Sequence, residues 1–324
     1  MKKKILVTGV AGFIGFHVTK KLLKEKFKIV GIDNLNSYYD VNLKRKRLKN
    51  LKNKNFIFYK SNISNSKKLE EIFKKHKFDL VINLAAQAGI RYSLINPRDY
   101  LNSNANGFFN IIDCCKKYNI KTLLYASSSS VYGNIKKFPY SLNNKVDKPL
   151  QFYAATKIFN EITAYCYSHL YKFKTVGLRF FTVYGPWGRP DMALFSFAKK
   201  IINGETIEIF NKGNHSRDFT YIDDVVDLIY RIVDLNIKNK NQKQKHEIYN
   251  IGGGKATKLI KFISLLEKHL NIKAKKKYIK KQPGDMDKTL ADIKKTKKVF
   301  KYKPKVKPDE GIKNFVNWYR NYTS

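Results

Sequence analysis

Cysteine is scarce in this sequence: three residues, Cys114, Cys115 and Cys166, stand among 324. The number is odd, and the two adjacent thiols cannot easily bridge each other, which is typical of proteins in a reducing compartment. The six histidines lack the spacing of zinc ligands, so we predict no metal site.

Long hydrophobic runs are also missing. No stretch approaches the ~20 apolar residues that a membrane-spanning helix needs. The N-terminal residues MKKKILVTGVAGFIGFHV begin like a signal peptide, but glycines interrupt the apolar run and no cleavage site follows. We therefore expect a soluble, cytoplasmic protein with no membrane partner.

Acidic residues are few: 25 aspartates and glutamates stand against 65 lysines and arginines, which gives a net charge of +40. A nucleic-acid-binding protein concentrates such charge in a patch or an arginine-rich stripe. Here lysine dominates and is spread along the chain, as at residues 44–54 and 294–307. We interpret it as a solvated surface that helps attract an anionic substrate, with no specific nucleic-acid partner. A functional polyanion site is the alternative.

Apolar stretches typical of β-strands alternate with helical stretches over the first half of the chain. Strands are expected at residues 5–9, 28–33, 56–60, 80–86, 122–128 and 175–181. Continuous apolar strands separated by helices predict a parallel sheet covered on both faces. One of the helices is expected to begin at Pro97 and to run to about residue 118.

A glycine-rich loop, GVAGFIG, joins the first expected strand to a helix through Gly9, Gly12 and Gly15. Glycine lets the backbone turn tightly and approach a pyrophosphate, which lies at the helix N-terminus. Asp33 ends the second expected strand, where a carboxylate can bind the adenosine ribose. Because that carboxylate repels the 2′-phosphate of NADP, the pattern predicts NAD. Tighter binding of NADP than of NAD would contradict this preference.

These features predict an α/β fold with a Rossmann-type doubly wound parallel sheet and a smaller C-terminal α/β substrate domain. The pattern loosens after residue 181. We therefore expect an NAD-binding domain at residues 1–181, with return segments at about 218–251, and a discontinuous substrate-binding domain at 182–324.

The stretch QFYAATKIFNE at residues 151–161 places Tyr153 and Lys157 four residues apart on an expected helix. Positions i and i+4 share one helix face, so the phenol and the ammonium can reach one point. An alcohol loses hydride readily only if its O–H proton leaves at the same time, yet a phenol with its usual pKa of ~10 stays protonated at neutral pH. A nearby ammonium favours the phenolate. Tyr153 is therefore the candidate general base, and Lys157 the group that tunes it and holds the nicotinamide ribose.

Several longer stretches resemble the extended short-chain dehydrogenase/reductases that act on nucleotide sugars, and most closely the bacterial UDP-glucuronate 4-epimerases of the NAD-dependent epimerase/dehydratase family. They cover most of residues 5–290 in order: GFIGFHV, GIDNLNSYYDVNLK, NLAAQAGIRYSLINP, YASSSSVYG, RFFTVYGPWGRPDMALF, RDFTYIDD and QPGDM. The resemblance implies epimerisation of UDP-glucuronate to UDP-galacturonate at C4, through a 4-keto intermediate with tightly bound NAD. It also implies a product used in polysaccharide biosynthesis and a homodimer packed through the helices at 96–118 and 152–171.

The resemblance assigns site residues as well. Ser128 would hydrogen-bond the reacting oxygen beside Tyr153 and Lys157. Cofactor contacts are implied for Gly9, Gly12, Phe13, Ile14, Gly15, Asp33, Asn34, Asn62, Ile63, Leu84, Ala85, Ala86, Tyr153 and Lys157. Substrate contacts are implied for Arg91, Ser128, Ser129, Ser130, Thr182, Arg189, Arg217 and Asp285. Asn62 stands where related proteins often carry an aspartate near the adenine.

The substrate residues have separate implied roles. Arg217 would pair with the diphosphate, since arginine suits phosphate geometry, and Asp285 would contact the uridine ribose. Arg91 would bind phosphate or carboxylate, with a structural salt bridge as the alternative.

Positions 129 and 130 separate the chemistries of related enzymes. Dehydratases that resemble this chain carry Asp-Glu there to eliminate water, and the UDP-glucuronate decarboxylases carry a glutamate at the second position. Ser129 and Ser130 offer no acid, which argues against both reactions. A 4-keto glucuronate readily loses CO₂, so we expect Ser129, Ser130 and Thr182 to hold its carboxylate and Arg189 to guard it.

Two alternatives remain open. An epimerase for neutral UDP-hexoses, such as UDP-glucose or a UDP-N-acetylhexosamine, is the rival enzyme, and substrate profiling separates the two. A non-catalytic Rossmann protein that binds RNA is the rival from another class, although such a protein would not need Ser128, Tyr153 and Lys157 together.

Overall fold

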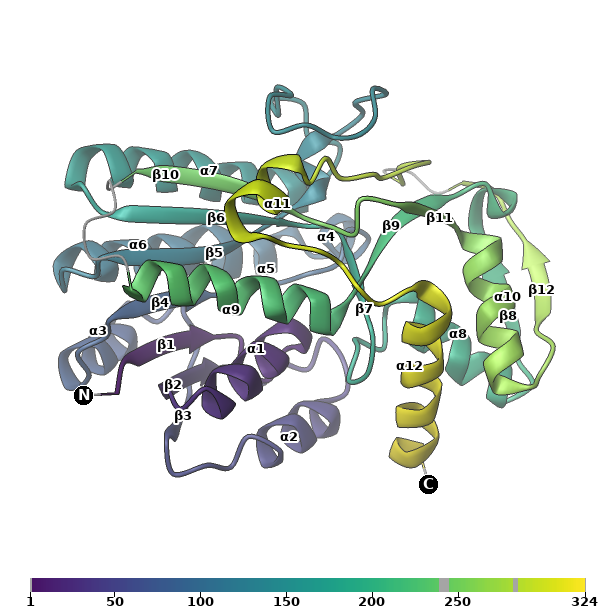
Figure 1. The fold of residues 1–324 in the computed structure, drawn as a ribbon, viewed down its shortest axis with the longest axis horizontal. Helices are drawn as coiled ribbons and strands as arrows, with labels where there is room; N and C mark the ends of the chain where they lie inside the picture. Colours follow the sequence, from purple (N-terminus) through teal and green to yellow (C-terminus); the bar gives the residue numbers. More distant parts are fainter. Residues whose placement is uncertain (1, 239–244, 282–284, 324) are drawn as a thin grey trace. The chain divides into compact units, whose positions relative to one another are not determined.

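The structure is a computed structural model that describes residues 2–238, 245–281 and 285–323. The chain divides into two compact units, drawn in Figure 1. Unit 1 comprises Met1–Gly133, Lys145–Phe180 and Val226–Tyr249, and unit 2 comprises Asn134–Asn144, Phe181–Val225 and Asn250–Ser324. Residues 134–144, which the sequence analysis placed in the first domain, fall in unit 2 because Tyr140 exchanges backbone hydrogen bonds with residues 290 and 292.

Among the described residues of unit 1, seven strands form one sheet in the order β10-β6-β5-β4-β1-β2-β3. They are β1 (Lys4–Thr8), β2 (Lys28–Asp33), β3 (Phe56–Lys60), β4 (Leu80–Asn83), β5 (Thr122–Ser128), β6 (Lys174–Phe180) and β10 (His246–Ile251). The neighbours from β3 through β1 to β6 pair in parallel, so the predicted parallel sheet is confirmed. The chain runs outward from β1 to β3 and then crosses to β4 on the other side of β1, which makes the β1–β4 boundary a topological switch point where such sheets bind ligands.

Helices cover both faces of this sheet. On one face α1 (Phe13–Lys24) and α9 (Ile222–Lys238) lie side by side, with Lys21 Nζ 4.7 Å from the centre of the Tyr230 ring (Figure 1). On the other face lie α3 (Ser66–Lys75), α6 (Gly107–Lys117) and α7 (Phe152–Tyr171). The shorter helices α2 (Val41–Lys49), α4 (Tyr92–Ile95) and α5 (Pro97–Tyr100) complete the unit.

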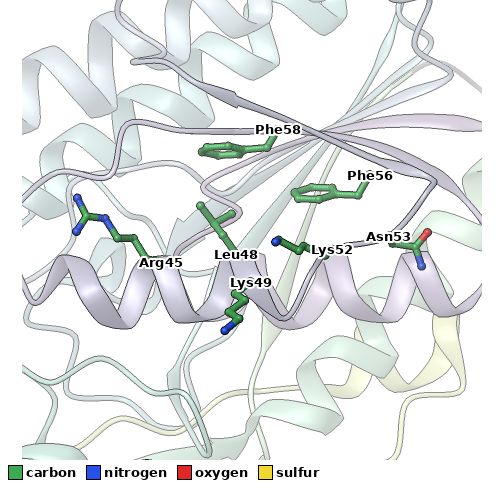
Figure 2. A pocket seen from close by; sticks show the side chains of 7 residues that line it. All are labelled: Arg45, Leu48, Lys49, Lys52, Asn53, Phe56 and Phe58. Atoms are coloured by element: carbon green, nitrogen blue, oxygen red, sulfur yellow. The ribbon is translucent and has the colours of Figure 1, made fainter.

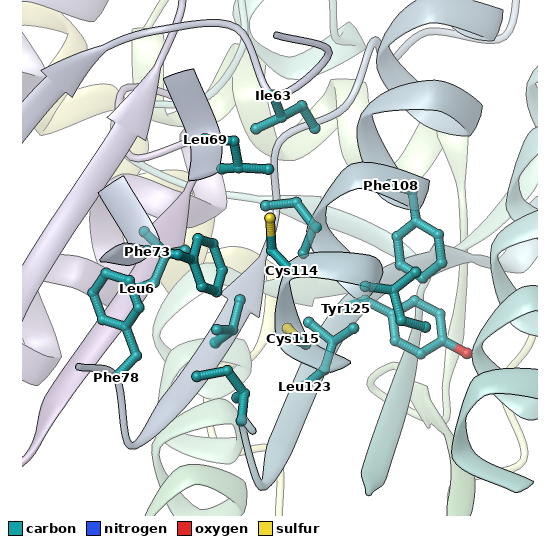
Figure 3. Close-up of a cluster of buried hydrophobic side chains, with 14 of the residues drawn as sticks. Leu6, Ile63, Leu69, Phe73, Phe78, Phe108, Cys114, Cys115, Leu123 and Tyr125 are labelled. Atoms are coloured by element: carbon teal, nitrogen blue, oxygen red, sulfur yellow. The ribbon is translucent and has the colours of Figure 1, made fainter. Parts of the chain in front are cut away.

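One hydrophobic cluster lies between the sheet and the helices α3, α6 and α7 (Figure 3). Leu6 of β1 and Leu123 of β5 belong to it, together with Phe73 of α3 and the neighbouring thiols Cys114 and Cys115 of α6. Burial raises the pKa of Cys114 to about 12. These thiols therefore act as small apolar core groups rather than reactive ones.

The helix predicted at residues 97–118 is interrupted. α5 ends at Tyr100, Leu101–Asn106 forms a π-helix, and α6 begins at Gly107. Within the wider turn, the Asn104 amide donates to the Gln87 carbonyl (3.0 Å) and to Thr156 Oγ1 (3.1 Å). The prediction of one continuous helix was wrong, because the residue types of LNSNAN do not distinguish a π-turn from an α-turn. Such insertions are frequent at functional sites.

Unit 2 has two small sheets. The described strands β7 (Thr182–Tyr184), β9 (Ser216–Tyr221) and β11 (Ala256–Lys258) form one, in the order β11-β9-β7, and β8 (Thr206–Ile209) pairs in parallel with β12 (Lys275–Tyr278). Its helices are α8 (Ala193–Ile202), α10 (Leu259–Leu270), α11 (Lys294–Phe300) and α12 (Pro308–Thr323). The fully buried carboxylate of Asp218 accepts the backbone N–H groups of Gly253, Gly254 and Ala291 at 2.6–3.0 Å. This carboxylate ties β9 to the glycine turn that follows β10.

A surface groove of about 620 Å³ lies between α2 and the edge strand β3 (Figure 2). Its lining combines apolar and cationic side chains: Leu48, Phe56, Phe58, Arg45, Lys49, Lys52 and Asn53. Phe56 and Phe58 belong to the first three residues of β3, so the groove lies away from the carboxyl ends of the strands, where ligands of this fold bind.

Within residues 2–238, 245–281 and 285–323, no helix is long and apolar enough to cross a membrane. In the same ranges, no three His, Cys, Asp or Glu side chains are placed to hold a metal ion.

Candidate active site

The glycine loop is so tightly packed that side chains would not fit. Gly9 has φ +74°, and a Cβ on it would lie 2.8 Å from the Ala85 nitrogen. A Cβ on Gly15 would lie 2.0 Å from the Gly9 carbonyl oxygen. Gly12 is the N-cap of α1 and provides no side-chain cap, which leaves the N–H groups of the first turn accessible to an anion. The loop therefore has the geometry that a dinucleotide pyrophosphate requires.

The first turn of α1 also places two further predicted cofactor residues. Phe13 is buried, where its ring meets His17 edge-on, and Ile14 is half-buried. They are the first two residues after Gly12, so they lie beside the predicted pyrophosphate position.

Asp33 lies at the carboxyl end of β2, as predicted. One carboxylate oxygen accepts the N–H of Ala11 in the glycine loop (3.0 Å), and the other accepts the N–H of Leu35 (2.9 Å). Burial raises the pKa of Asp33, and these hydrogen bonds and two nearby cations oppose that rise. The next residue, Asn34, uses its side-chain oxygen to accept the N–H of Asn36 (3.1 Å). The carboxylate is thus fixed beside the loop, where the adenosine ribose of a dinucleotide would lie.

The two cations beside Asp33 are Lys44 and Arg47 of α2, and both are buried. Arg47 donates to the Ala11 carbonyl and to the Tyr39 hydroxyl, each at 2.7 Å, and Lys44 donates to the Asn36 carbonyl at 2.6 Å. The interpretation of residues 44–54 as a solvated lysine-rich face was wrong for these two. Nothing in the local pattern distinguishes them from the neighbouring exposed lysines, since only the tertiary fold buries them.

The remaining predicted cofactor residues lie on the adjoining strand ends. The Asn62 side chain accepts the N–H of Ser64 (3.1 Å) in a local turn after β3, and Ile63 belongs to the hydrophobic cluster. Leu84, Ala85 and Ala86 follow β4 and are half-buried. Thr8, which the sequence analysis missed, accepts the Ala85 N–H (3.1 Å) through its hydroxyl. A threonine inside an apolar strand gives no local sign of this role.

Tyr153 and Lys157 lie on the first two turns of α7, which packs on β5. Lys157 is 2% exposed, and its Nζ donates to the Ala126 carbonyl of β5 (2.9 Å). The same Nζ lies 5.8 Å from the centre of the Tyr153 ring. Burial lowers the pKa of Lys157 to about 8, against the raising effect of Glu161. The ammonium is therefore close enough to the phenol to influence its proton affinity.

The serine run follows directly along β5. Ser128 is the last residue of the strand, and its hydroxyl oxygen accepts hydrogen bonds from the Ser130 N–H (3.2 Å) and the Ser130 hydroxyl (2.9 Å). Ser130 is buried and Ser129 is half-buried. The run thus lies at the carboxyl end of a central strand whose partner α7 carries Tyr153 and Lys157.

Arg91 lies apart from this group, as an exposed residue that precedes α4. The buried Asn104, which the sequence analysis did not single out, contacts Thr156 on α7, and the Thr156 hydroxyl donates to the Tyr153 carbonyl (2.8 Å). The π-helix therefore helps to fix the turn of α7 that carries Tyr153.

The predicted substrate residues of unit 2 form two groups. Arg217 of β9 donates to the carbonyls of Ser216 and Asp287 (3.2 Å each). Burial lowers the pKa of Arg217, and the charge of the Asp285 carboxylate partly opposes that shift. In QPGDM, residues 282–284 lie outside the described residues. Residues 287–289 exchange backbone hydrogen bonds with Ser216, which explains how Arg217 and Asp285 come together.

Thr182 and Arg189 belong to the segment after β6. Thr182 is the half-buried first residue of β7, opposite Phe219 of β9. Arg189 forms a two-pronged ion pair with Asp191, in which Nε lies 3.0 Å from one carboxylate oxygen. This carboxylate partner was not predicted from the sequence, and it holds the guanidinium side-on in its loop.

Comparison with known proteins identifies the family. Residues 5–252 match the model of the NAD dependent epimerase/dehydratase family. The chain belongs to this family. It is 51% identical to an uncharacterised protein of Methanocaldococcus jannaschii, over 98% of this chain and 96% of that one. It is also 42% identical to UDP-glucuronate 4-epimerase 4 of Arabidopsis thaliana, over 99% of this chain and 76% of the relative.

A solved structure supports the same family assignment. The fold matches that of UDP-glucuronic acid 4-epimerase from Bacillus cereus, solved with UDP-glucuronic acid and NAD, with a TM-score of 0.91. The two are 33% identical, and the match covers 98% of this chain and 99% of the other. The Rossmann-type fold of this family member is thus confirmed along almost its whole length.

Proposed function

We propose that this family member is an NAD-dependent epimerase that interconverts UDP-glucuronate and UDP-galacturonate by inverting C4 of the sugar. The main support is the match over 98% of the chain to a UDP-glucuronic acid 4-epimerase, joined with the placement of Lys157 against Tyr153 on α7. The fit of a dinucleotide is supported independently by the cradle at Gly9 and Gly15, which a Cβ would fill.

NAD, when bound in that cradle, supplies a hydride acceptor for the C4 carbon of the sugar and a donor for its return. The protein would hold it through the glycine loop at the pyrophosphate and Asp33 at the adenosine ribose. Tyr153 takes the proton of the C4 hydroxyl as the alcohol becomes a ketone, and it returns a proton after the ketone has exposed its opposite face. Lys157 stabilises the phenolate between these events, and Ser128 donates a hydrogen bond to the C4 oxygen.

Substrate profiling separates this function from its rival. The purified protein with NAD should convert UDP-glucuronate to UDP-galacturonate, with a kcat/KM at least about a hundredfold above that for UDP-glucose or UDP-N-acetylglucosamine, because a polar site rejects analogues that leave its groups unpaired. Chromatography of the UDP-sugars gives the rates. A higher kcat/KM for UDP-glucose would transfer the specificity to neutral sugars.

Carboxylate control is the second part of the proposal. The 4-keto intermediate is a β-keto acid, which loses CO₂ when its carboxylate turns perpendicular to the ketone. Ser129, Ser130 and Thr182 would hold that carboxylate by hydrogen bonds, with Arg189 as its polar guard. The pairing of Arg189 with Asp191 supports this, because it fixes the guanidinium in one orientation.

Arg189→Ala should therefore release CO₂ and yield a UDP-pentose in addition to the epimer. The expected pentose share is at least about a tenth of the product, which means that epimerisation stays favoured over decarboxylation by no more than about 1.3 kcal/mol. Trapped CO₂ and chromatography measure the two products. The control Arg231→Ala removes an arginine of α9 that is also paired with a carboxylate, at 2.9 Å, through a side chain that is 41% exposed, and it should give no pentose. Clean epimerisation by Arg189→Ala would refute the guard role.

We further propose a homodimer that packs through α6 and α7. The outer face of these two helices carries large exposed apolar side chains: Phe109, Phe159, Ile162, Tyr165 and Leu170, which are 42–64% exposed in the single chain. Contiguous exposed apolar surface of this kind marks an interaction site. The two helices pack side by side, so two copies can form a four-helix bundle.

Ile162→Lys should convert the dimer to a monomer, because it buries a charge in that apolar bundle. Light scattering after size-exclusion chromatography gives the mass of each species. Val299→Lys changes an equally apolar exposed residue of α11 in unit 2, 42% exposed, and should leave the dimer intact. A dimer that survives Ile162→Lys, or a monomeric unmodified protein, would contradict the proposal.

We also propose a cytoplasmic location, which the free thiols Cys114, Cys115 and Cys166 support.

A further inference from the structure

Behind the Tyr153–Lys157 pair, α7 carries a third polar residue on the same face. Tyr153, Lys157 and Glu161 follow one another at steps of four, which places them in one row along the helix. Glu161 is 5% exposed and accepts two hydrogen bonds from Arg179 of β6, from Nε at 2.8 Å and from Nη2 at 2.7 Å. A carboxylate–guanidinium pair is thus buried within one helical turn of the candidate catalytic lysine.

The strands fix this pair from the other side. Ser127 of β5 is the register partner of Arg179 on β6, and its hydroxyl donates to the same Glu161 carboxylate. The Arg179 guanidinium carbon lies 4.8 Å from the centre of the Tyr132 ring, which covers it. Glu161 is therefore held by donors from two neighbouring strands and cannot easily turn away from Lys157.

Lys157 needs such a partner because its own surroundings disfavour its charge. The Lys157 side chain is buried, and its ammonium donates a hydrogen bond to the Ala126 carbonyl, which carries no charge. Burial lowers its pKa, and the Glu161 charge is the group that raises it. Other titratable and charged side chains surround the row formed by Tyr153, Lys157 and Glu161. Those on the strands and just after them are Tyr125 on β5, Tyr132 after β5 and Arg179 on β6. Those on the helices packed against α7 are Tyr92 on α4, Tyr100 on α5 and, farther along, Asp113 on α6.

We propose that Glu161, held in place by Arg179 and Ser127, is a positioning residue that keeps Lys157 protonated and so keeps Tyr153 competent for proton transfer. The inference rests on the catalytic roles proposed above for Tyr153 and Lys157. Arg179 holds the carboxylate in a fixed orientation, and the negative charge of Glu161 stabilises the neighbouring ammonium. A purely structural ion pair would affect folding but would not alter the titration of Lys157.

The test compares pH profiles of kcat/KM for UDP-glucuronate, measured at saturating NAD and constant ionic strength. In the unmodified protein the rate should fall as pH rises through about 8, because Lys157 loses its proton there. In Glu161→Gln this upper limb should move to lower pH by about one unit or more. The variant should consequently lose about fivefold or more in rate at pH 8 and much less at pH 6.5.

Glu161→Gln alone leaves Arg179 buried without its carboxylate and can unfold the protein. The double variant Glu161→Gln/Arg179→Met removes both charges and avoids that cost. It should still show the displaced upper limb. A folded double variant with the pH profile of the unmodified protein would overturn the inference.

A second readout does not depend on turnover. Ultraviolet difference absorbance, measured against Tyr153→Phe in each background, reports the phenolate of Tyr153. The phenolate should form at higher pH in the double variant than in the unmodified background, and identical titrations would overturn the inference. Glu267→Gln removes another buried carboxylate, paired with Lys276 at 2.9 Å in unit 2, and should leave both readouts unchanged.

Lys157→Met distinguishes a failure of the role inferred for Glu161 from a failure of the catalytic roles proposed for Tyr153 and Lys157. If Lys157→Met is inactive and the double variant keeps the unmodified pH profile, the role of Glu161 fails while the catalytic roles stand. If Lys157→Met keeps its full kcat, the catalytic role of Lys157 fails and the inference falls with it.

Discussion

Replacing Tyr153 with phenylalanine should lower kcat for UDP-glucuronate by a factor of about 10²–10⁴, the usual contribution of a general acid–base. The substitution removes one oxygen atom from a half-buried side chain, so the fold should be unchanged. The affinity for NAD should change little, since the glycine loop and Asp33 hold the adenosine half. Steady-state rates and NAD titration by fluorescence measure the two effects.

Tyr167→Phe is the matched control for this variant. Tyr167 lies on the same helix, and its hydroxyl donates to Asp113 of α6 at 3.3 Å, away from β5. Loss of that hydrogen bond should cost about 1 kcal/mol of stability and leave kcat unchanged. A Tyr153→Phe protein with a kcat within threefold of the unmodified protein would show that another group moves the proton.

Gly15→Ala should weaken NAD binding strongly. Its Cβ would lie 2.0 Å from the Gly9 carbonyl oxygen and 2.7 Å from the carbonyl carbon, so the first turn of α1 must move away from the end of β1. That movement displaces the N–H groups that face the pyrophosphate. We expect the Kd for NAD to rise at least about a hundredfold, or about 2.8 kcal/mol, with a loss of about 1–3 kcal/mol in folding free energy.

Gly12→Ala provides a graded comparison for the same loop. Its Cβ would lie 3.0 Å from the same carbonyl oxygen, a milder contact that a small backbone shift relieves. The rise in Kd should therefore be smaller than for Gly15→Ala. Calorimetric titration with NAD, and thermal unfolding without it, measure affinity and stability separately. Equal affinities in the two variants would mean that close backbone packing does not position the cofactor.

The elements that could be predicted from the sequence are those with a strong local pattern. Strands β2, β3 and β5 occupy the residues expected for them, because continuous apolar runs bounded by polar residues are typical of parallel strands. The strand β12, Lys275–Tyr278, was missed, since three consecutive lysines resemble a charged surface segment. It forms because β8 offers a parallel partner, which no local pattern reveals.

The residues of the candidate site also divide into those with a local sequence signal and those brought together only by the fold. Gly9, Gly15 and Asp33 follow from local geometry, since the loop and the strand end are contiguous with the elements that place them. Glu161 and Arg179 meet only because α7 packs on β6, and each alone looks unremarkable in its element. Nonlocal pairs of this kind require the fold before they can be recognised.

In the proposed reaction, C4 of the sugar is oxidised and reduced within one active site by a cofactor that is regenerated each turn. The most direct measurement uses UDP-glucuronate labelled with deuterium at C4, incubated with the purified protein and NAD in ordinary water. The expected product is UDP-galacturonate that keeps the deuterium at C4, because the abstracted hydride returns to the same carbon. Product that has exchanged this deuterium for solvent hydrogen would rule this reaction out, and so would conversion without any change at C4.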